Sequence, residues 1–162
     1  MNKQLLLAAT LIAAVIPANA AFAEDHEVRM LNRGADGEMM VFEPAYLEVE
    51  PGDTVTFLAT DPSHNAEIIA GMLPEGAEPF RGRINQEITV TLTEDGVYGV
   101  KCLPHYGLGM VALIKVGDGE APNLEDAAAV RHPGRATQRM AALFDRLEAG
   151  DAAAGPAETG AR

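Results

Sequence analysis

Short β-forming segments separated by turn residues fill the chain from about residue 25 to residue 116, and they limit its fold more than any other feature. In one of them Ile88, Val90 and Leu92 alternate with threonines, the period of two that predicts a half-buried strand. The turn signals between segments include Pro51-Gly52-Asp53 and Glu94-Asp95-Gly96. Seven or eight such strands predict an all-β Greek-key β-sandwich or barrel. Residues 66–85 carry too many Gly and Pro for a long element, so we expect a crossing connection there.

Two helices are predicted after Gly119. Asn123 is a candidate N-cap for a short helix from Leu124 to about Val130. A second helix with an apolar stripe is expected over 136–149, and Gly150 is a candidate C′ residue after it. The stripe consists of Met140, Leu143, Phe144 and Leu147. We expect it to pack on the sandwich; a helix that binds a partner is the alternative.

The two ends of the chain differ in composition from the rest. Residues 1–23 combine Lys3, an apolar run and two A-x-A patterns, as in a secretory signal peptide cleaved before Glu24. A membrane anchor or a buried helix is the alternative, but the run is short for a bilayer. We therefore expect domain boundaries at 24–120 for the sandwich and 121–150 for its helical extension, followed by a disordered tail at 151–162. Export to a bacterial periplasm, without membrane insertion, follows from this interpretation.

Charge and cysteine content exclude several classes of function. The net charge of −12 becomes −13 when residues 1–23 are removed, because Lys3 is their only charged residue. An acidic chain without Trp is a poor partner for nucleic acid. The single cysteine, Cys102, excludes an intramolecular disulfide framework, a multi-cysteine zinc knuckle and an iron–sulfur cluster.

The cysteine lies in a cluster of possible metal ligands. Cys102-x2-His105-x4-Met110 places a thiol, an imidazole and a thioether between two predicted strands, and this donor set suits copper. His64, in a turn-like stretch, is the best candidate for a second imidazole. A trigonal His2Cys site with a long axial Met is the arrangement of blue-copper electron transfer. Met110 could instead be a core residue at the start of an apolar strand. His64, taken alone, is no stronger a candidate for a metal ligand than any other histidine.

The other residues of these types have simpler interpretations. His26 and His132 are expected to be solvated, and four further methionines, Met39, Met40, Met72 and Met140, to be core residues. The carboxylates show no paired acid–base arrangement. Asn65, beside His64, is expected to hold the loops of the site and to tune its potential.

These motifs together resemble the cupredoxins, and in particular the pseudoazurin family. The resemblance covers about residues 26–149 and includes the stretches 40–46, 51–57, 74–77 and 101–110. Two helices after the last strand are typical of pseudoazurin-like members. The resemblance implies that His64, Cys102, His105 and Met110 bind one type 1 copper ion. It also implies that His105 lies at an exposed apolar edge with residues such as Met39, Ile84, Pro104 and Leu108.

The resemblance implies a monomeric periplasmic electron carrier rather than an enzyme. Nitrite reductase or nitrous oxide reductase of denitrification would be the acceptor, and a cytochrome or other protein the donor. The family presents a lysine-rich docking face, whereas this chain has only Lys101 and Lys115 after the signal, with Arg33, Arg81 and Arg83 as a smaller basic set. A copper storage or delivery protein is the first alternative. A Cys102–His105 hydrolase is the second, and it lacks an orienting third group.

Overall fold

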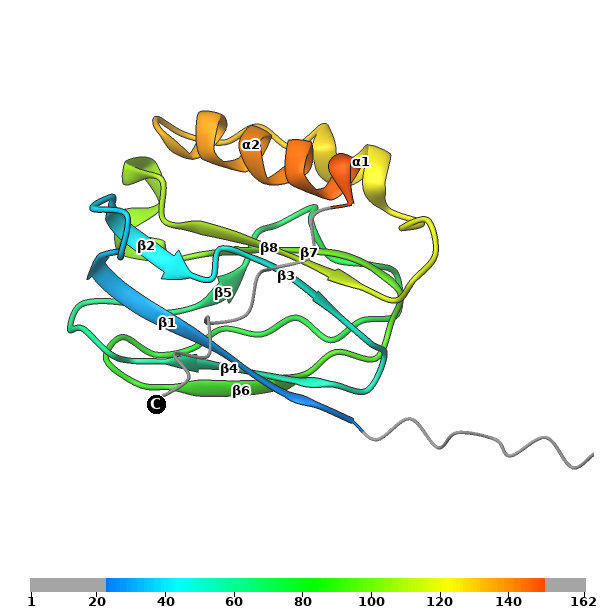
Figure 1. Cartoon of the computed structure of the whole chain (residues 1–162), viewed down its shortest axis with the longest axis horizontal. Coiled ribbons are helices and arrows are strands. Elements are labelled where there is room, and N and C mark those ends of the chain that lie inside the picture. The colour runs from blue at the N-terminus through cyan, green and yellow to red at the C-terminus, as the bar shows by residue number, and fades with distance from the viewer. Residues whose placement is uncertain (1–22, 151–162) are drawn as a thin grey trace, which may run out of the picture.

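The computed structural model describes residues 23–150 as two four-stranded sheets covered on one side by helices (Figure 1). One sheet has the order β2-β1-β4-β6 and the other β3-β8-β7-β5. The strands are β1 (Asp25–Arg33), β2 (Met39–Glu43), β3 (Tyr46–Val49), β4 (Thr54–Leu58), β5 (Glu67–Ile68), β6 (Ile88–Thr91), β7 (Gly96–Lys101) and β8 (Val111–Val116). The helices are the 3-10 helix η1 (Leu103–Leu108), α1 (Leu124–Ala128) and α2 (Ala136–Ala149). The predicted all-β sandwich with two C-terminal helices is confirmed.

Most neighbouring strands in the two sheets are not consecutive in the chain, so the sheets are not built from simple hairpins. β1 pairs antiparallel with β2 but parallel with β4, and β3 pairs parallel with β8. Parallel neighbours require connections that cross between the sheets. The 66–85 segment also crosses between the sheets, because it leads from β5 in one sheet towards β6 in the other. Within it β5 pairs with β7, and Glu67 forms an isolated bridge with Arg81. The expected crossing connection therefore also supplies an edge strand.

The main core lies between the two sheets. The alternating residues Val28 and Met30 of β1 are buried there, and Phe42 and Phe57 meet edge to face with ring centroids 5.7 Å apart. The same cluster includes Cys102 and Met110. Cys102, which directly follows β7, therefore lies in the main core, and β7 itself is buried on both faces.

A second core lies between the outer face of the β3-β8-β7-β5 sheet and the helices. Val111 and Leu113 of β8 join Met140 and Leu143 of α2 in this cluster, and Figure 1 shows both helices over this sheet. The predicted stripe therefore packs on the sandwich as expected. β8 is buried on both faces, which explains its continuous apolar sequence.

The short helix differs from the prediction in two respects. It ends at Ala128 rather than near Val130, and Asn123 makes no side-chain cap. Its amide instead accepts a hydrogen bond from the Val97 N–H and donates one to the Val97 carbonyl, both at 2.9 Å. Asn123 thus fastens the helical extension to β7. The signal-peptide and tail predictions fall on residues 1–22 and 151–162, outside the described residues.

Candidate metal centre

A short loop, residues 102–110, joins β7 to β8 and carries three of the four predicted donors. We call it the donor loop. Pro104 lies in the first turn of η1, where its missing N–H costs nothing, and Gly109 ends the turn at φ 94°. The Cys102 N–H donates to the Met110 carbonyl (3.0 Å), and the Met110 N–H donates to the His105 carbonyl (3.2 Å). The backbone therefore closes on itself and brings the three residues to one end of the sandwich.

His64 joins this loop from the connection after β4. Its Nδ1 lies 3.0 Å from His105 Nδ1 and 3.7 Å from the Cys102 sulfur, while His105 Nδ1 lies 3.5 Å from that sulfur. These three are the one group among residues 23–150 whose His, Cys, Asp and Glu donor atoms gather in this way, all within 4.8 Å of one another. Met110 is fully buried in the same core cluster as Cys102. Three of the four predicted donor atoms therefore lie in direct proximity, and the Met110 backbone is bonded to Cys102 and His105.

The orientation of His64 is set by a residue that the sequence prediction did not include. Asn32, on β1, places its Oδ1 3.0 Å from His64 Nε2. Because this oxygen can only accept, Nε2 carries the proton and the Nδ1 lone pair faces Cys102 and His105. A neighbour that fixes the tautomer is the usual support of a metal-binding histidine. Asn32 has no local sequence signal, since only the pairing of strands brings it to His64.

Both the sequence and the fold of this chain are similar to those of known copper proteins. Residues 28–117 match the family model described as copper binding proteins of the plastocyanin/azurin family. The chain is 52% identical to a pseudoazurin of Paracoccus pantotrophus over 83% of this chain and 91% of that protein. It is 44% identical to the Methylorubrum extorquens pseudoazurin over 90% and 97% of the two chains. The solved pseudoazurin structure from Sinorhizobium meliloti superposes with a TM-score of 0.75 at 47% identity, covering 78% of this chain and 98% of that one.

The chain belongs to the pseudoazurin family of copper-binding proteins. It is therefore a blue copper electron carrier rather than an enzyme, with copper as its cofactor and redox proteins as its partners. No helix within residues 23–150 combines the length and the apolar character that crossing a membrane would need.

The electrostatics of this cupredoxin site favour a soft metal. Burial raises the pKa of the Cys102 thiol, so the thiolate requires a nearby cation. Burial, and then the charge of His105, lower the pKa of His64, which keeps its imidazole neutral and able to donate a lone pair. Two imidazoles, one thiol and a buried thioether fit copper better than the harder cations that prefer oxygen.

Asn65 supports the site as predicted, through three hydrogen bonds. Its Oδ1 accepts from the Leu103 N–H at 2.8 Å. Its Nδ2 donates to Glu67 Oε2 and to the Gly82 carbonyl, each at 3.1 Å. The residue after Cys102 is thereby tied to the connection that carries His64. The expected holding role is confirmed, whereas the tuning of the potential stays a prediction.

The predictions for two histidines and one methionine outside the site need correction. His26 and His132 are not simply solvated, because His26 Nε2 pairs with Asp53 at 2.9 Å and His132 Nδ1 lies 2.6 Å from the Tyr106 hydroxyl. Met72 and Met140 are core residues as predicted, and Met40 is half-buried. Met39, however, is exposed, as are Ile84, Leu103 and Leu108. This agrees with the apolar edge implied by the family resemblance.

The two lysines among the described residues, Lys101 and Lys115, both have partners within the molecule. Lys101 lies 3.4 Å from Glu67 and 5.1 Å from the centre of the Tyr106 ring. Lys115 donates to the Gly117 carbonyl. Arg81 pairs with the same Glu67 carboxylate at 3.0 Å. The buried Glu67 is therefore the shared partner of Lys101 and Arg81, and its single charge offsets one of their two positive charges.

Proposed function

We propose that His64, Cys102, His105 and Met110 bind one type 1 copper ion, and that the protein shuttles single electrons in the periplasm. The gathering of His64 Nδ1, His105 Nδ1 and the Cys102 sulfur within 4.8 Å is the observation that carries the proposal. The bound copper would supply one-electron cycling between Cu(II) and Cu(I). The protein's part is to hold the donors. Asn32, Asn65 and the closed donor loop restrict their movement, and a site that moves little between two oxidation states transfers electrons readily.

The exposed apolar edge supports the route by which electrons enter and leave. His105 is half-buried, and Leu103 and Leu108 of the same 3-10 helix are exposed at 45% and 51%. Ile84 adjoins Asn85, whose N–H donates to the His64 carbonyl. We infer that a redox partner docks on this edge and that His105 is the donor through which the electron passes.

An absorption titration tests the copper site. Adding Cu(II) to the apo protein should give an intense visible thiolate-to-copper band at one equivalent. Cys102→Ser should abolish the band, and His26→Gln, which removes a histidine distant in sequence from the donor loop, should retain it. A colourless product in the unmutated protein would refute the site. Reversible redox cycling without copper loss would distinguish a carrier from a storage or delivery protein.

The axial assignment of Met110 has a test of its own. Met110→Leu should keep the copper and the visible band but raise the reduction potential, because a weak donor to Cu(II) is lost. An unchanged potential would contradict axial ligation.

We further propose nitrite reductase or nitrous oxide reductase as acceptor, with a cytochrome or similar protein as donor. The pseudoazurin relatives support this class of partner, and residues 1–23 support export. Stopped-flow oxidation of the reduced protein by each purified reductase tests the acceptor. Since Glu67 offsets one of the two charges of Lys101 and Arg81 and the chain is acidic as a whole, we expect the rate to fall only slightly with added salt. A mature N-terminus at Glu24 in the periplasmic fraction would support export, and an uncleaved cytoplasmic chain would refute it.

A further inference from the structure

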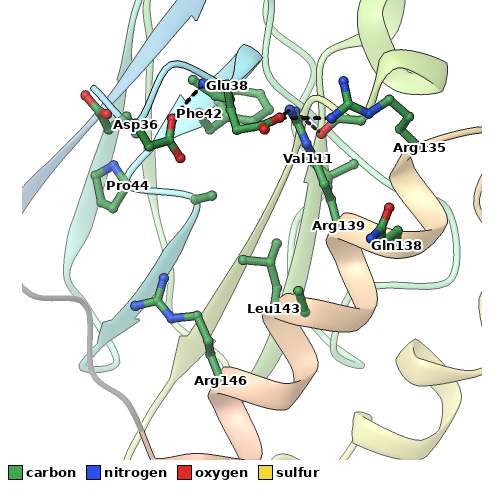
Figure 2. A pocket seen from close by; sticks show the side chains of 15 residues that line it. Asp36, Glu38, Phe42, Pro44, Val111, Arg135, Gln138, Arg139, Leu143 and Arg146 are labelled. Atoms are coloured by element: carbon green, nitrogen blue, oxygen red, sulfur yellow. Dashed lines mark hydrogen bonds and ion pairs between the residues drawn. The ribbon is translucent and has the colours of Figure 1, made fainter. Parts of the chain in front are cut away.

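Arg139 of α2 is the point at which the helix, strand β2 and the donor loop meet. Its Nη1 donates to the Gly109 carbonyl at 2.9 Å and to the Met40 carbonyl at 2.8 Å. Its Nη2 donates to the Met39 carbonyl at 3.0 Å and to Glu38 Oε2 at 2.7 Å. Figure 2 shows this side chain and that of Arg135 reaching from the helix toward Glu38. One guanidinium therefore holds three backbone carbonyls and a carboxylate.

The contact with Gly109 is unusually close and lies next to a candidate donor. Gly109 has φ 94° and immediately precedes Met110, and a Cβ at this position would lie 2.8 Å from Arg139 Cδ. The arginine stem therefore packs directly on the glycine backbone. Only 19% of the Arg139 side chain is exposed, so water competes weakly for these hydrogen bonds.

The segment before α2 contacts the same loop farther from Met110. The Arg135 N–H donates to the Gly107 carbonyl at 3.0 Å, and His132 hydrogen-bonds to Tyr106. These contacts secure the middle of the donor loop, whereas Arg139 secures the residue that leads into Met110. At β2 it also fixes the carbonyl of Met40, a residue with φ 54° that packs against the core cluster containing Met110.

We propose that Arg139 is a positioning residue for the copper site, setting the placement of Met110 through the Gly109 carbonyl and through β2. The inference rests on the proposed axial role of Met110. This positioning role depends on the shape of the arginine side chain. A planar guanidinium can donate to several acceptors in fixed directions, whereas a lysine ammonium carries the same charge without that fork.

Arg146 offers a matched control on the same helix. Its guanidinium lies 5.0 Å from the centre of the Tyr46 ring on β3, and Figure 2 shows it farther along the helix than Arg139, apart from Glu38. Arg146→Lys removes a guanidinium contact between α2 and the sandwich without touching the donor loop. Both variants preserve charge, so a difference between them reports geometry.

The experiment measures the reduction potential and the visible spectrum of the copper-loaded Arg139→Lys and Arg146→Lys proteins, with thermal unfolding of both apo forms. Arg139→Lys should raise the potential in the same direction as Met110→Leu and by less, and should change the relative intensities of the copper bands. Arg146→Lys should leave both unchanged. If Arg139→Lys lowers only the melting temperature, its role is merely structural and the proposal is wrong.

A double-mutant cycle with Met110→Leu makes the test specific. If Arg139 acts through Met110, adding Arg139→Lys to Met110→Leu should shift the potential far less than it does in the unmutated protein. An equal shift in both backgrounds would overturn the proposal. If Met110→Leu alone leaves the potential unchanged, the fault lies in the axial assignment rather than in Arg139.

Discussion

Asn65→Ala should destabilise the apo protein strongly for a single small side chain. The change removes the three hydrogen bonds that Asn65 makes to Leu103, Glu67 and Gly82. Glu67 keeps Arg81 and Lys101 as partners, and both Leu103 and Gly82 are reachable by water. Each lost bond should therefore contribute at the low end, ~1 kcal/mol, which gives a total loss of about 3 kcal/mol. At ~4 °C per kcal/mol for a domain of this size, the melting temperature should fall by about 12 °C.

Thermal unfolding of the apo forms is the assay, because bound metal would add its own binding free energy to the stability. Gln138→Ala, which truncates an exposed amide on α2, is the control and should stay within ~0.5 kcal/mol. The copper-loaded Asn65→Ala protein should also show an altered reduction potential, since the residue after Cys102 loses its anchor. A melting temperature as close to the unmutated value as that of Gln138→Ala would refute the reasoning.

Two further variants test the contacts between the helical extension and the donor loop. Burial lowers the pKa of His132, so the unfolded chain takes up the proton first as pH falls, and the stability that this residue contributes should be lost below about pH 6.5. Urea unfolding of the apo protein should therefore show a gap between the unmutated chain and His132→Asn that narrows from pH 7.5 to pH 5; a gap that widens in acid would contradict the sign. Gly134→Ala should cost ~1 kcal/mol or more beyond Gly150→Ala. Both glycines have positive φ, but a Cβ at 134 would overlap the Gly107 carbonyl whereas one at 150 meets nothing within 4 Å. Equal melting temperatures for this pair would show that the overlap is relieved without cost.

The fold and the donors were accessible from the sequence because both depend on short-range patterns. The alternation in 88–92 and the stripe along 136–149 each report which face is buried, and β6 and α2 form there. Likewise Cys102, His105 and Met110 are close in the chain, so a single tight turn brings them together. His64 required a second argument, since its 41-residue separation from His105 is closed only by the packing of the sheets.

The supporting residues were harder to predict because their partners are distant in the chain and of ordinary type. Asn123 has the residue type and position of a helix cap, but its side-chain amide forms hydrogen bonds with the backbone of Val97 instead. Asn32 and Arg139 reach groups 32 and about 100 residues away. Hydrogen-bonding side chains of this kind carry no periodic signal, so only the assembled sheets identify their partners.

The burial of β7 and β8 on both faces has a consequence for the chemical safety of the thiol. Local opening of a protein exposes its least protected segments first, and these two strands, between the main core and the helical layer, should be the last to open. Their amide protons should therefore exchange with solvent nearly as slowly as global unfolding permits, more slowly than those of β6. Cys102 directly follows β7 and is fully buried. An oxidant or alkylating reagent should therefore reach its sulfur by opening of the donor loop, on the side of the half-buried His105, and not through the sheet behind it.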